Sequence, residues 1–105
     1  MSPRHFVLPA AALLLLCAFP AAAADGAALF KSKCAMCHGP DGAGGTAMGK
    51  KLEVRALGSA DVQKQSNGDL MTIIKKGKGK MPPYAGKLSD DEVKALIRHI
   101  RSFAS

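Results

Sequence analysis

The spacing of apolar positions predicts one strong amphipathic helix at the C-terminal end of the chain. Apolar residues recur at positions 93, 96, 97, 100 and 103, which is the three- and four-residue spacing of a single helix face. Ser89, followed three residues later by Glu92, has the pattern of a capping box that opens a helix. The acids at 90–92 complement the helix dipole. We therefore expect a helix from about residue 90 to the chain end.

Weaker apolar stripes predict further short helices. Asp25 can cap a helix over 26–33, in which Leu29 and Phe30 are the inward candidates. A helix that Ser66 can cap and Gly77 can end has apolar positions at 70, 73 and 74, and one turn is expected near 59–62. The chain shows no strand-type alternation and no internal repeat. These patterns predict an all-α domain.

Residues 1–24 have the pattern of a secretory signal peptide. Arg4 precedes an apolar run over 6–19, and four alanines end at Ala24, where the small-residue rule places the cleavage site. The run is short for a membrane span and contains Pro9, so a retained anchor is the less favoured alternative. A single arginine instead of a twin pair favours Sec export. We expect a periplasmic protein whose mature domain is 25–105.

The composition of 25–105 favours a buried cofactor. Loss of Arg4 with the leader lowers the formal net charge from +7 to +6 and leaves two cysteines, Cys34 and Cys37. Phe30, Tyr84 and Phe103 are the only aromatic residues of this segment. Small exported domains commonly depend on disulfides, because their cores are thin. Two cysteines three residues apart leave none for a structural disulfide, so a covalently held apolar group would supply the missing bulk.

The sequence Cys34-Ala35-Met36-Cys37-His38 is the attachment signature of a c-type haem. If Cys34 opens a helical turn, Cys37 and His38 lie on the same face, so two thiols can form thioethers while the imidazole reaches the iron. A zinc site would need a second pair of ligands, and a thioredoxin-like dithiol would need a βαβ context. Neither pattern occurs in the sequence. We therefore predict one covalently attached haem c.

A haem iron bound by His38 has a second axial position to fill. The candidates in the mature chain are Met36, Met48, Met71, Met81 and His99. Met81 is favoured because Pro82 and Pro83 follow it and hold it in an extended loop. Met48 is the competitor, since it also lies in a loop. The other three are expected to serve packing or the surface.

The segment after His38 is predicted to wrap the cofactor. Residues 39–45 are rich in glycine and show neither helical nor strand periodicity. Their glycines are expected to let the backbone fold closely around a flat ligand. Met48, Leu52, Val54 and Leu57 are expected to add apolar contacts.

The chain resembles the class I cytochromes c, especially the small bacterial and cytochrome c6-like carriers. The resemblance covers 25–105 and rests on the CxxCH segment, on Gly39-Pro40-Asp41-Gly42, on Gly79-Lys80-Met81-Pro82 and on the start of the last helix at 88–97. It implies a cytochrome c fold, with three to four short helices around one covalent haem. It also implies crossed terminal helices, with Gly26 and Phe30 near Leu96, and axial ligation by His38 and Met81.

Two positions depart from the family pattern. His99 stands where family members often carry an aromatic residue, so we expect a looser or more polar helix crossing there. Many relatives have a proline ahead of the position of Leu52, whose carbonyl holds the proximal imidazole, whereas this chain has Lys50-Lys51. The acceptor for the imidazole is therefore left open.

These features predict a one-electron carrier and not an enzyme. Lysines at 75, 76, 78, 80 and 87 flank Met81, and others at 31, 33, 50 and 51 lie near the CxxCH segment. They would favour redox donors and acceptors with acidic docking patches, although a generic basic surface is the alternative. Nucleic acid is disfavoured, membrane contact is expected only through partner complexes, and a monomer is expected. The rival functions are a haem enzyme or gas sensor with a labile axial site, and a fixed subunit of a larger redox complex.

Overall fold

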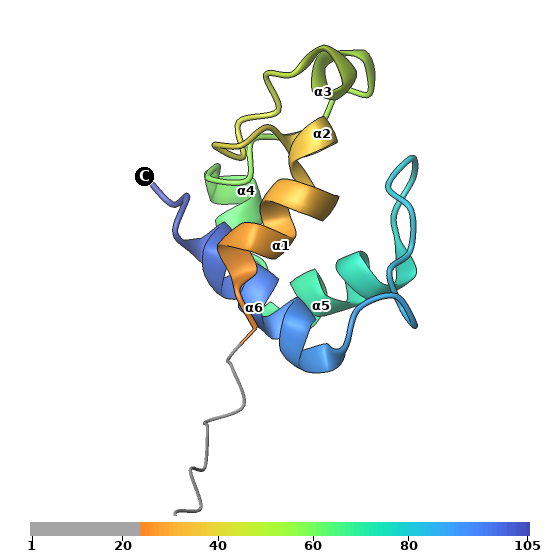
Figure 1. The fold of residues 1–105 in the computed structure, drawn as a ribbon. Helices are drawn as coiled ribbons and strands as arrows, with labels where there is room; N and C mark the ends of the chain where they lie inside the picture. Colours follow the sequence, from red (N-terminus) through yellow and green to blue (C-terminus); the bar gives the residue numbers. More distant parts are fainter. Residues whose placement is uncertain (1–23) are drawn as a thin grey trace, which may run out of the picture.

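The computed structural model describes residues 24–105, and the predicted signal peptide therefore lies outside the described residues except for Ala24. This part of the chain is helical and contains two isolated β-bridges but no strand. No helix of the described residues is long and apolar enough to cross a membrane. The helices, shown in Figure 1, are α1 (Gly26–Lys33), α2 (Ala35–His38), α3 (Ala47–Lys51), α4 (Ala60–Gln63), α5 (Asn67–Lys76) and α6 (Asp90–Arg101).

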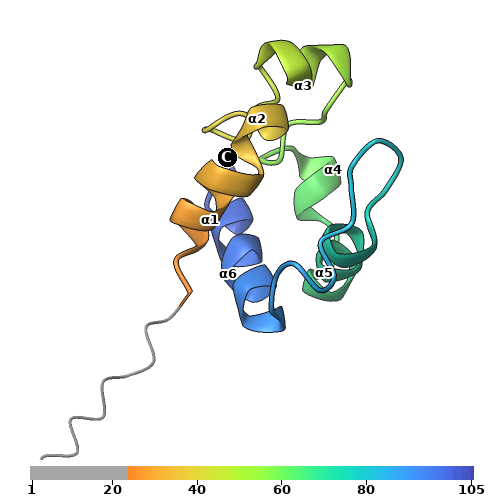
Figure 2. The ribbon, with the colours of Figure 1, turned by 45° about the vertical axis from the view of Figure 1, so that its right-hand side comes forward.

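The first and last helices cross and form the centre of the core. In Figures 1 and 2, α1 lies across α6, and α5 flanks α6 from another side. Phe30 and Leu96 are almost fully buried, with exposed fractions of 2% and 1%. A Cβ on Gly26 would collide with the backbone oxygen of Ala95, so the glycine is needed for this close approach. The implied crossing of Gly26 and Phe30 with the segment around Leu96 is thus present.

The predicted boundaries of α5 and the predicted start of α6 are confirmed, whereas α6 ends at Arg101 and does not run to the chain end. Ser66 and Ser89 each form a complete capping box, and Gly77 ends α5. The end of α5 is joined to the start of α6 by an ion pair between Lys75 Nζ and Asp90 Oδ1 at 2.7 Å. The hydrogen bond from Lys75 and its charge lower the pKa of Asp90. This contact helps to fix the spacing of α5 and α6, which are joined by the loop over residues 77–89.

The expectation of three to four helices is wrong, because the described residues form six. The additional elements are α2 and α3, with four and five residues. Helices this short complete little more than one turn, so they leave no apolar periodicity in the sequence. They are instead defined by the bend at Cys34 and by the cap of Thr46, whose hydroxyl accepts a hydrogen bond from Gly49 N at 2.9 Å.

Candidate functional site

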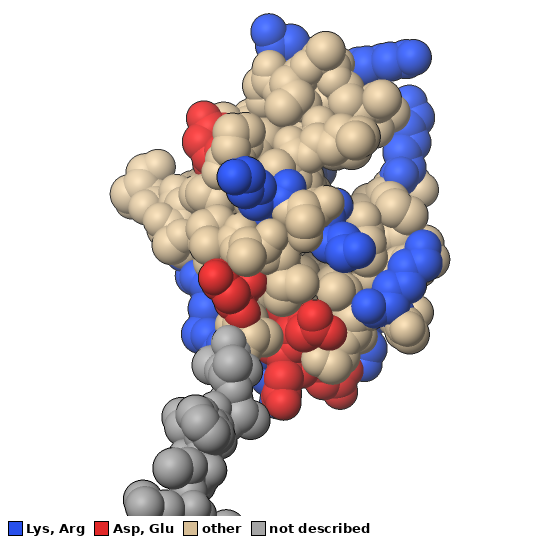
Figure 3. Space-filling view, viewed as in Figure 1, with Lys and Arg blue, Asp and Glu red and all other residues tan. Residues whose placement is uncertain are grey.

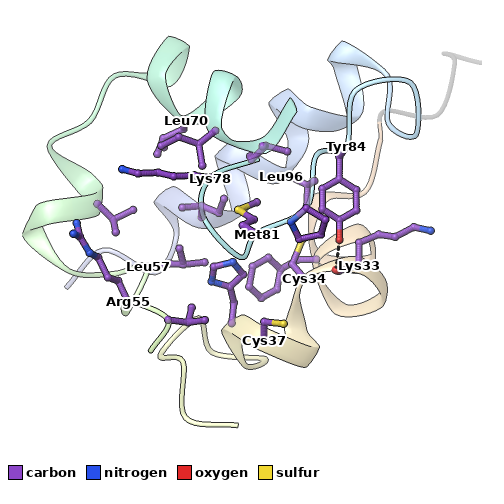
Figure 4. Close-up of a pocket in the computed structure, with 18 of the residues that line it drawn as sticks. Lys33, Cys34, Cys37, Arg55, Leu57, Leu70, Lys78, Met81, Tyr84 and Leu96 are labelled. Atoms are coloured by element: carbon purple, nitrogen blue, oxygen red, sulfur yellow. Dashed lines mark hydrogen bonds between the residues drawn. The ribbon is translucent and has the colours of Figure 1, made fainter. Parts of the chain in front are cut away.

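An apolar cavity of about 350 Å³ opens between the helices. Its walls come from α1, α2, residues 52–57, α4, α5, the loop over residues 78–84 and α6. Most of the lining is hydrocarbon, including Leu57, Leu70, Ile74, Leu96 and Ile100. Figure 4 shows Cys34 and Cys37 on one side of this cavity and Met81 entering it from the loop. A pocket of this size and polarity suits a small organic cofactor.

The two thiols are held by a short, well-braced turn. Cys34 caps α2, and its carbonyl accepts hydrogen bonds from the backbone N–H of Cys37 at 3.2 Å and of His38 at 3.0 Å. The Thr46 hydroxyl donates to the Met36 carbonyl at 2.7 Å, which ties the turn to α3. Burial and, second, the neighbouring Cys37 raise the pKa of Cys34 to about 11. Both cysteines are free thiols, and both line the cavity.

The His38 imidazole also lines the cavity, and its chemistry fits metal ligation. Burial lowers the pKa of His38, which favours the neutral ring that can donate a lone pair. Its Nδ1 is buried and has no hydrogen-bond partner among the described residues. The carbonyl that the family pattern would place against this nitrogen is therefore not supplied by the Lys50-Lys51 segment. The acceptor that the sequence left open for this nitrogen is thus not found among the described residues.

Met81 is the only methionine among the described residues that lines the cavity. Its backbone forms an isolated bridge with Lys78, and Pro82 and Pro83 follow directly. Met48, the competing candidate, does not line the cavity and is 41% exposed, while Met36 is 75% exposed. Met71 packs against the hydrophobic core outside the cavity lining. The geometry thus separates Met81 from the other three.

His99 lies in an aromatic cluster outside the cavity lining. Its ring centroid is 5.1 Å from that of Phe30 and 4.8 Å from that of Phe103, in a T-shaped arrangement with the latter. The sequence left it as a packing or a surface residue, and the structure shows the packing role. The expectation of a looser crossing is wrong, because the imidazole packs against Phe30 and Phe103 as an aromatic ring would. The alternative, a more polar crossing, stays compatible with this half-buried imidazole.

The predicted wrap of residues 39–45 around the cofactor is also wrong. No residue of this loop lines the cavity, and neither does Met48. The loop instead packs on protein, since Gly42 lies against the Phe103 ring and Gly44 against the Val54 carbonyl. Leu52, Val54 and Leu57 do line the cavity, as expected. The loop therefore supports the cavity wall from behind.

Several cavity residues were not singled out from the sequence. Tyr84 lines the cavity, and its hydroxyl donates to the Lys33 carbonyl at 3.2 Å. Arg55 and Gln65 line it from segments that carry no recognisable motif. The cavity position of Tyr84 could have been predicted, because it is one of few aromatic residues and directly follows Pro82-Pro83. Arg55 offered none, since an arginine in a loop is ordinary.

Positive side chains border the cavity. Lys33, Arg55, Lys78 and Lys80 are among its lining residues, and Glu53 is the one acidic residue that lines it. In Figure 4, Arg55 and Lys78 lie at the end away from Cys34 and Tyr84. Figure 3 shows a hollow with Lys and Arg side chains around it, while acidic side chains gather at the lower edge of the same face. No group of three or more His, Cys, Asp or Glu side chains that could hold a metal ion occurs within residues 24–105.

The donor set and the cavity fit a covalently bound haem. Two thiols, an imidazole and a thioether line one largely apolar space in a helical domain. Thioether and imidazole are the axial donors that cytochromes c use. The molecule is therefore a c-type cytochrome of the small class I type.

Comparison with known proteins agrees with this class. The chain belongs to the family described as "Cytochrome C oxidase, cbb3-type, subunit III", which matches residues 21–100. Its similarity to the cytochrome c6 of Synechococcus sp. is 33% identity, covering 79% of this chain and 71% of the relative. The cytochrome c6 of Thermosynechococcus vestitus is 30% identical, with 95% and 91% of the two chains covered.

A solved structure shares the fold. The "KustC0563 c-type cytochrome" superposes with a TM-score of 0.71 at 36% identity, covering 77% of this chain and 99% of that chain. The cytochrome c fold and the covalently attached haem c predicted from the sequence are thereby confirmed. The family makes this chain an electron-transfer haem protein.

Proposed function

We propose that the protein is a one-electron carrier, not an enzyme, whose haem c is bound through thioethers to Cys34 and Cys37 and through axial bonds to His38 and Met81. The observation that carries this proposal is that all four side chains line one apolar cavity. The haem iron supplies the exchangeable electron. With donors from both α2 and the Met81 loop, no axial position is left for oxygen or peroxide, which opposes catalysis.

Each protein group has a separate task in this proposal. Burial keeps the His38 imidazole neutral and able to donate electrons. The soft thioether of Met81 favours the reduced iron and so raises the reduction potential relative to two nitrogen ligands. The apolar walls exclude water, which limits the reorganisation that accompanies a change of charge. Arg55 and Lys78 would balance the negative carboxylates of the cofactor at the end of the cavity away from Cys34.

The partners in this proposal are a redox donor and a redox acceptor with acidic docking patches. Lys33, Lys78 and Lys80 border the cavity, so a negatively charged partner would be attracted to the side where the cofactor is nearest the surface. The protein acts as a monomer, does not bind nucleic acid, and meets the membrane only through partner complexes. Export of the chain by a Sec-type signal at 1–24 would place it in the periplasm. N-terminal sequencing of the mature protein from a periplasmic fraction tests cleavage after Ala24.

Absorption spectroscopy of the loaded protein tests the axial ligands. The wild type is expected to show low-spin ferric features and a weak near-infrared band from methionine bound to ferric iron. Met81→Ala should lose that band, lower the reduction potential and bind added imidazole. Met48→Ala is the matched control and should leave all three unchanged. High-spin ferric features in the wild type, or ready binding of carbon monoxide, would instead support an enzyme or gas sensor.

A second candidate is a fixed subunit of a larger redox complex. The observation that favours it is the description of the matching family, which names an oxidase subunit. A free carrier should elute from a sizing column of gently solubilised cells as a small protein of its own mass. Co-elution of the haem signal with a membrane oxidase, stable to moderate salt, would favour the subunit.

A further inference from the structure

The backbone of Met81 rests directly on the Cα of Gly77. Lys78 N donates to Met81 O at 3.1 Å and Met81 N donates to Lys78 O at 3.0 Å, which closes a tight turn after α5. A Cβ placed on Gly77 would lie 2.5 Å from Met81 O and 3.0 Å from Pro82 C and Pro83 N. Real Cβ atoms do not approach backbone atoms so closely. A side chain at position 77 would therefore displace the segment that carries Met81.

The conformation of Gly77 is itself restricted to glycine. Its φ is 75° and its ψ is 169°, a region that residues with a Cβ essentially do not adopt. Its N–H donates to Ile73 O at 2.8 Å, so the residue still belongs to the end of α5. The position thus changes the chain direction within one residue. It turns the α5 backbone back so that the following loop returns over the helix end.

Beyond Met81 the loop is fastened again to the same helix. Tyr84 N donates to Ile74 O at 3.0 Å and Ala85 N donates to Lys75 O at 3.0 Å. Residues 78–83 are therefore a short bridge between two attachments on α5. Because both ends of residues 78–83 are held, a displacement caused at Gly77 must be taken up within this segment. The segment contains Met81, so the displacement would move the methionine that lines the cavity.

We infer that Gly77 is the positioning residue for Met81: it sets the path of the loop that aims the thioether into the cavity. This inference rests on the proposed axial role of Met81 and adds the residue that makes this role possible. Gly77 does not itself touch the cofactor cavity. Its effect on the iron acts through Met81 alone.

Two glycines in the same region provide matched controls. Gly79 and Gly86 also have positive φ, +57° and +79°, but a Cβ on either would meet nothing within 4 Å. Gly79→Ala and Gly86→Ala therefore impose backbone strain on the same loop without a collision against Met81. A comparison with Gly77→Ala separates the collision from the strain that positive φ alone imposes.

The test uses loaded protein and reads the near-infrared methionine band, the reduction potential and the affinity for added imidazole. Gly77→Ala should lose the band, shift the potential toward that of Met81→Ala, and bind imidazole at least about tenfold more tightly than wild type, because the open state is no longer a minor population. Gly79→Ala and Gly86→Ala should stay close to wild type. Haem content and helical circular dichroism should be retained in all of them.

A double-variant comparison checks that Gly77 acts through Met81. In a Met81→Ala background, Gly77→Ala should produce no further change in imidazole affinity, since the ligand that it positions is already gone. An additional change of comparable size would overturn the inference. So would a Gly77→Ala protein with the wild-type band, or one no different from Gly79→Ala.

A second variant keeps the inference testable if Gly77→Ala does not fold. If Gly77→Ala does not accumulate as loaded protein, Gly77→Asn repeats the test, because asparagine adopts positive φ more often than alanine while its Cβ makes the same collision with Met81 O. Loss of the near-infrared band in Gly77→Asn supports the inference, and a Gly77→Asn protein that keeps the band overturns it. Failure of both variants to hold haem overturns it as well, since Gly77 would then support the whole fold. If the wild type lacks the near-infrared band, both the proposed ligation by Met81 and this inference are wrong. If Gly77→Ala keeps the band, only the inference about Gly77 is wrong.

Discussion

Tyr84 is the residue that ties the Met81 loop to the cysteine-bearing side of the cavity. Its hydroxyl donates to the Lys33 carbonyl at the end of α1, and burial raises the pKa of Tyr84. The phenol therefore remains a donor at neutral and mildly alkaline pH. The bond joins two segments that are far apart in sequence.

Tyr84→Phe removes this bond and keeps the ring, so we expect the free energy of unfolding to fall by about 1 kcal/mol. Urea unfolding of the loaded protein, followed by circular dichroism, measures the change. Lys87→Gln is the control, because Lys87 Nζ lies 5.8 Å from the Tyr84 ring centroid and is exposed. A Tyr84→Phe protein as stable as wild type would show that the hydrogen bond contributes nothing.

At the scale of single residues, the sequence was most informative where the chemistry is local. Cys34, Cys37 and His38 could be assigned together because helical spacing alone brings them to one face. Met81 could be favoured because two prolines act on it directly. Arg55 and Tyr84 reach the cavity only through the packing of distant segments, which no local pattern encodes.

Among the elements, the crossing of α1 and α6 depends most on one small residue. Gly26→Ala would place a methyl group against the Ala95 backbone, so we expect a loss of about 1–3 kcal/mol in unfolding free energy. Thermal or urea unfolding of the loaded protein measures it. The change should not alter the near-infrared band, because Gly26 does not line the cavity.

Gly68→Ala provides the helical control for this prediction. A Cβ on Gly68 would meet only Ser66 Oγ at 3.7 Å, an ordinary contact. Alanine should stabilise α5 there by about 0.5 kcal/mol, since it restricts the unfolded chain. If Gly26→Ala and Gly68→Ala changed the free energy of unfolding equally, the close approach of α1 and α6 would not be the reason for a glycine at position 26.

Elements with their own start and stop signals were predicted well. Ser66, Gly77 and Ser89 supply caps that act within four residues, and the boundaries of α5 and α6 follow from them. The helices α2 and α3 were not predicted as elements because each completes little more than one turn, which is too short for an apolar stripe to repeat. The loop over 39–45 was misassigned since glycines that allow close packing do not reveal which surface they pack against.

For the molecule as a whole, charge is distributed unevenly. The cavity is bordered by Lys33, Lys78 and Lys80, whereas the first turn of α6 carries three acids, Asp90, Asp91 and Glu92. Figure 3 shows the two signs on different parts of one face. An approaching ion is therefore attracted or repelled according to the side from which it arrives.

This asymmetry predicts opposite responses to anionic and cationic electron donors. At low salt, Lys78→Gln with Lys80→Gln should slow reduction of the ferric protein by anionic dithionite about threefold or more and should accelerate reduction by cationic hexaammineruthenium(II). Both effects should fade at about 1 M salt, where charges are screened over roughly 3 Å. Stopped-flow measurement of the rates tests this.

Lys64→Gln is the control for Lys78→Gln alone, which also removes one charge, because Lys64 pairs with Asp61 and does not line the cavity. It should alter either rate much less than a cavity lysine does. Equal effects from Lys64 and Lys78 would mean that overall net charge, not its placement, governs the encounter.

The proposed attachment residues and the proposed distal ligand, Met81, differ in how much of the chain must be folded before they can act. Cys34, Cys37 and His38 sit within five consecutive residues, on a turn braced by its own backbone bonds. Met81 reaches the cavity only when α5, Gly77 and the bridge after it have formed. Under the proposed ligation, attachment of the porphyrin would require only this local turn, whereas closure of the sixth coordination site would require α5 and the following loop, so that closure would report completed folding.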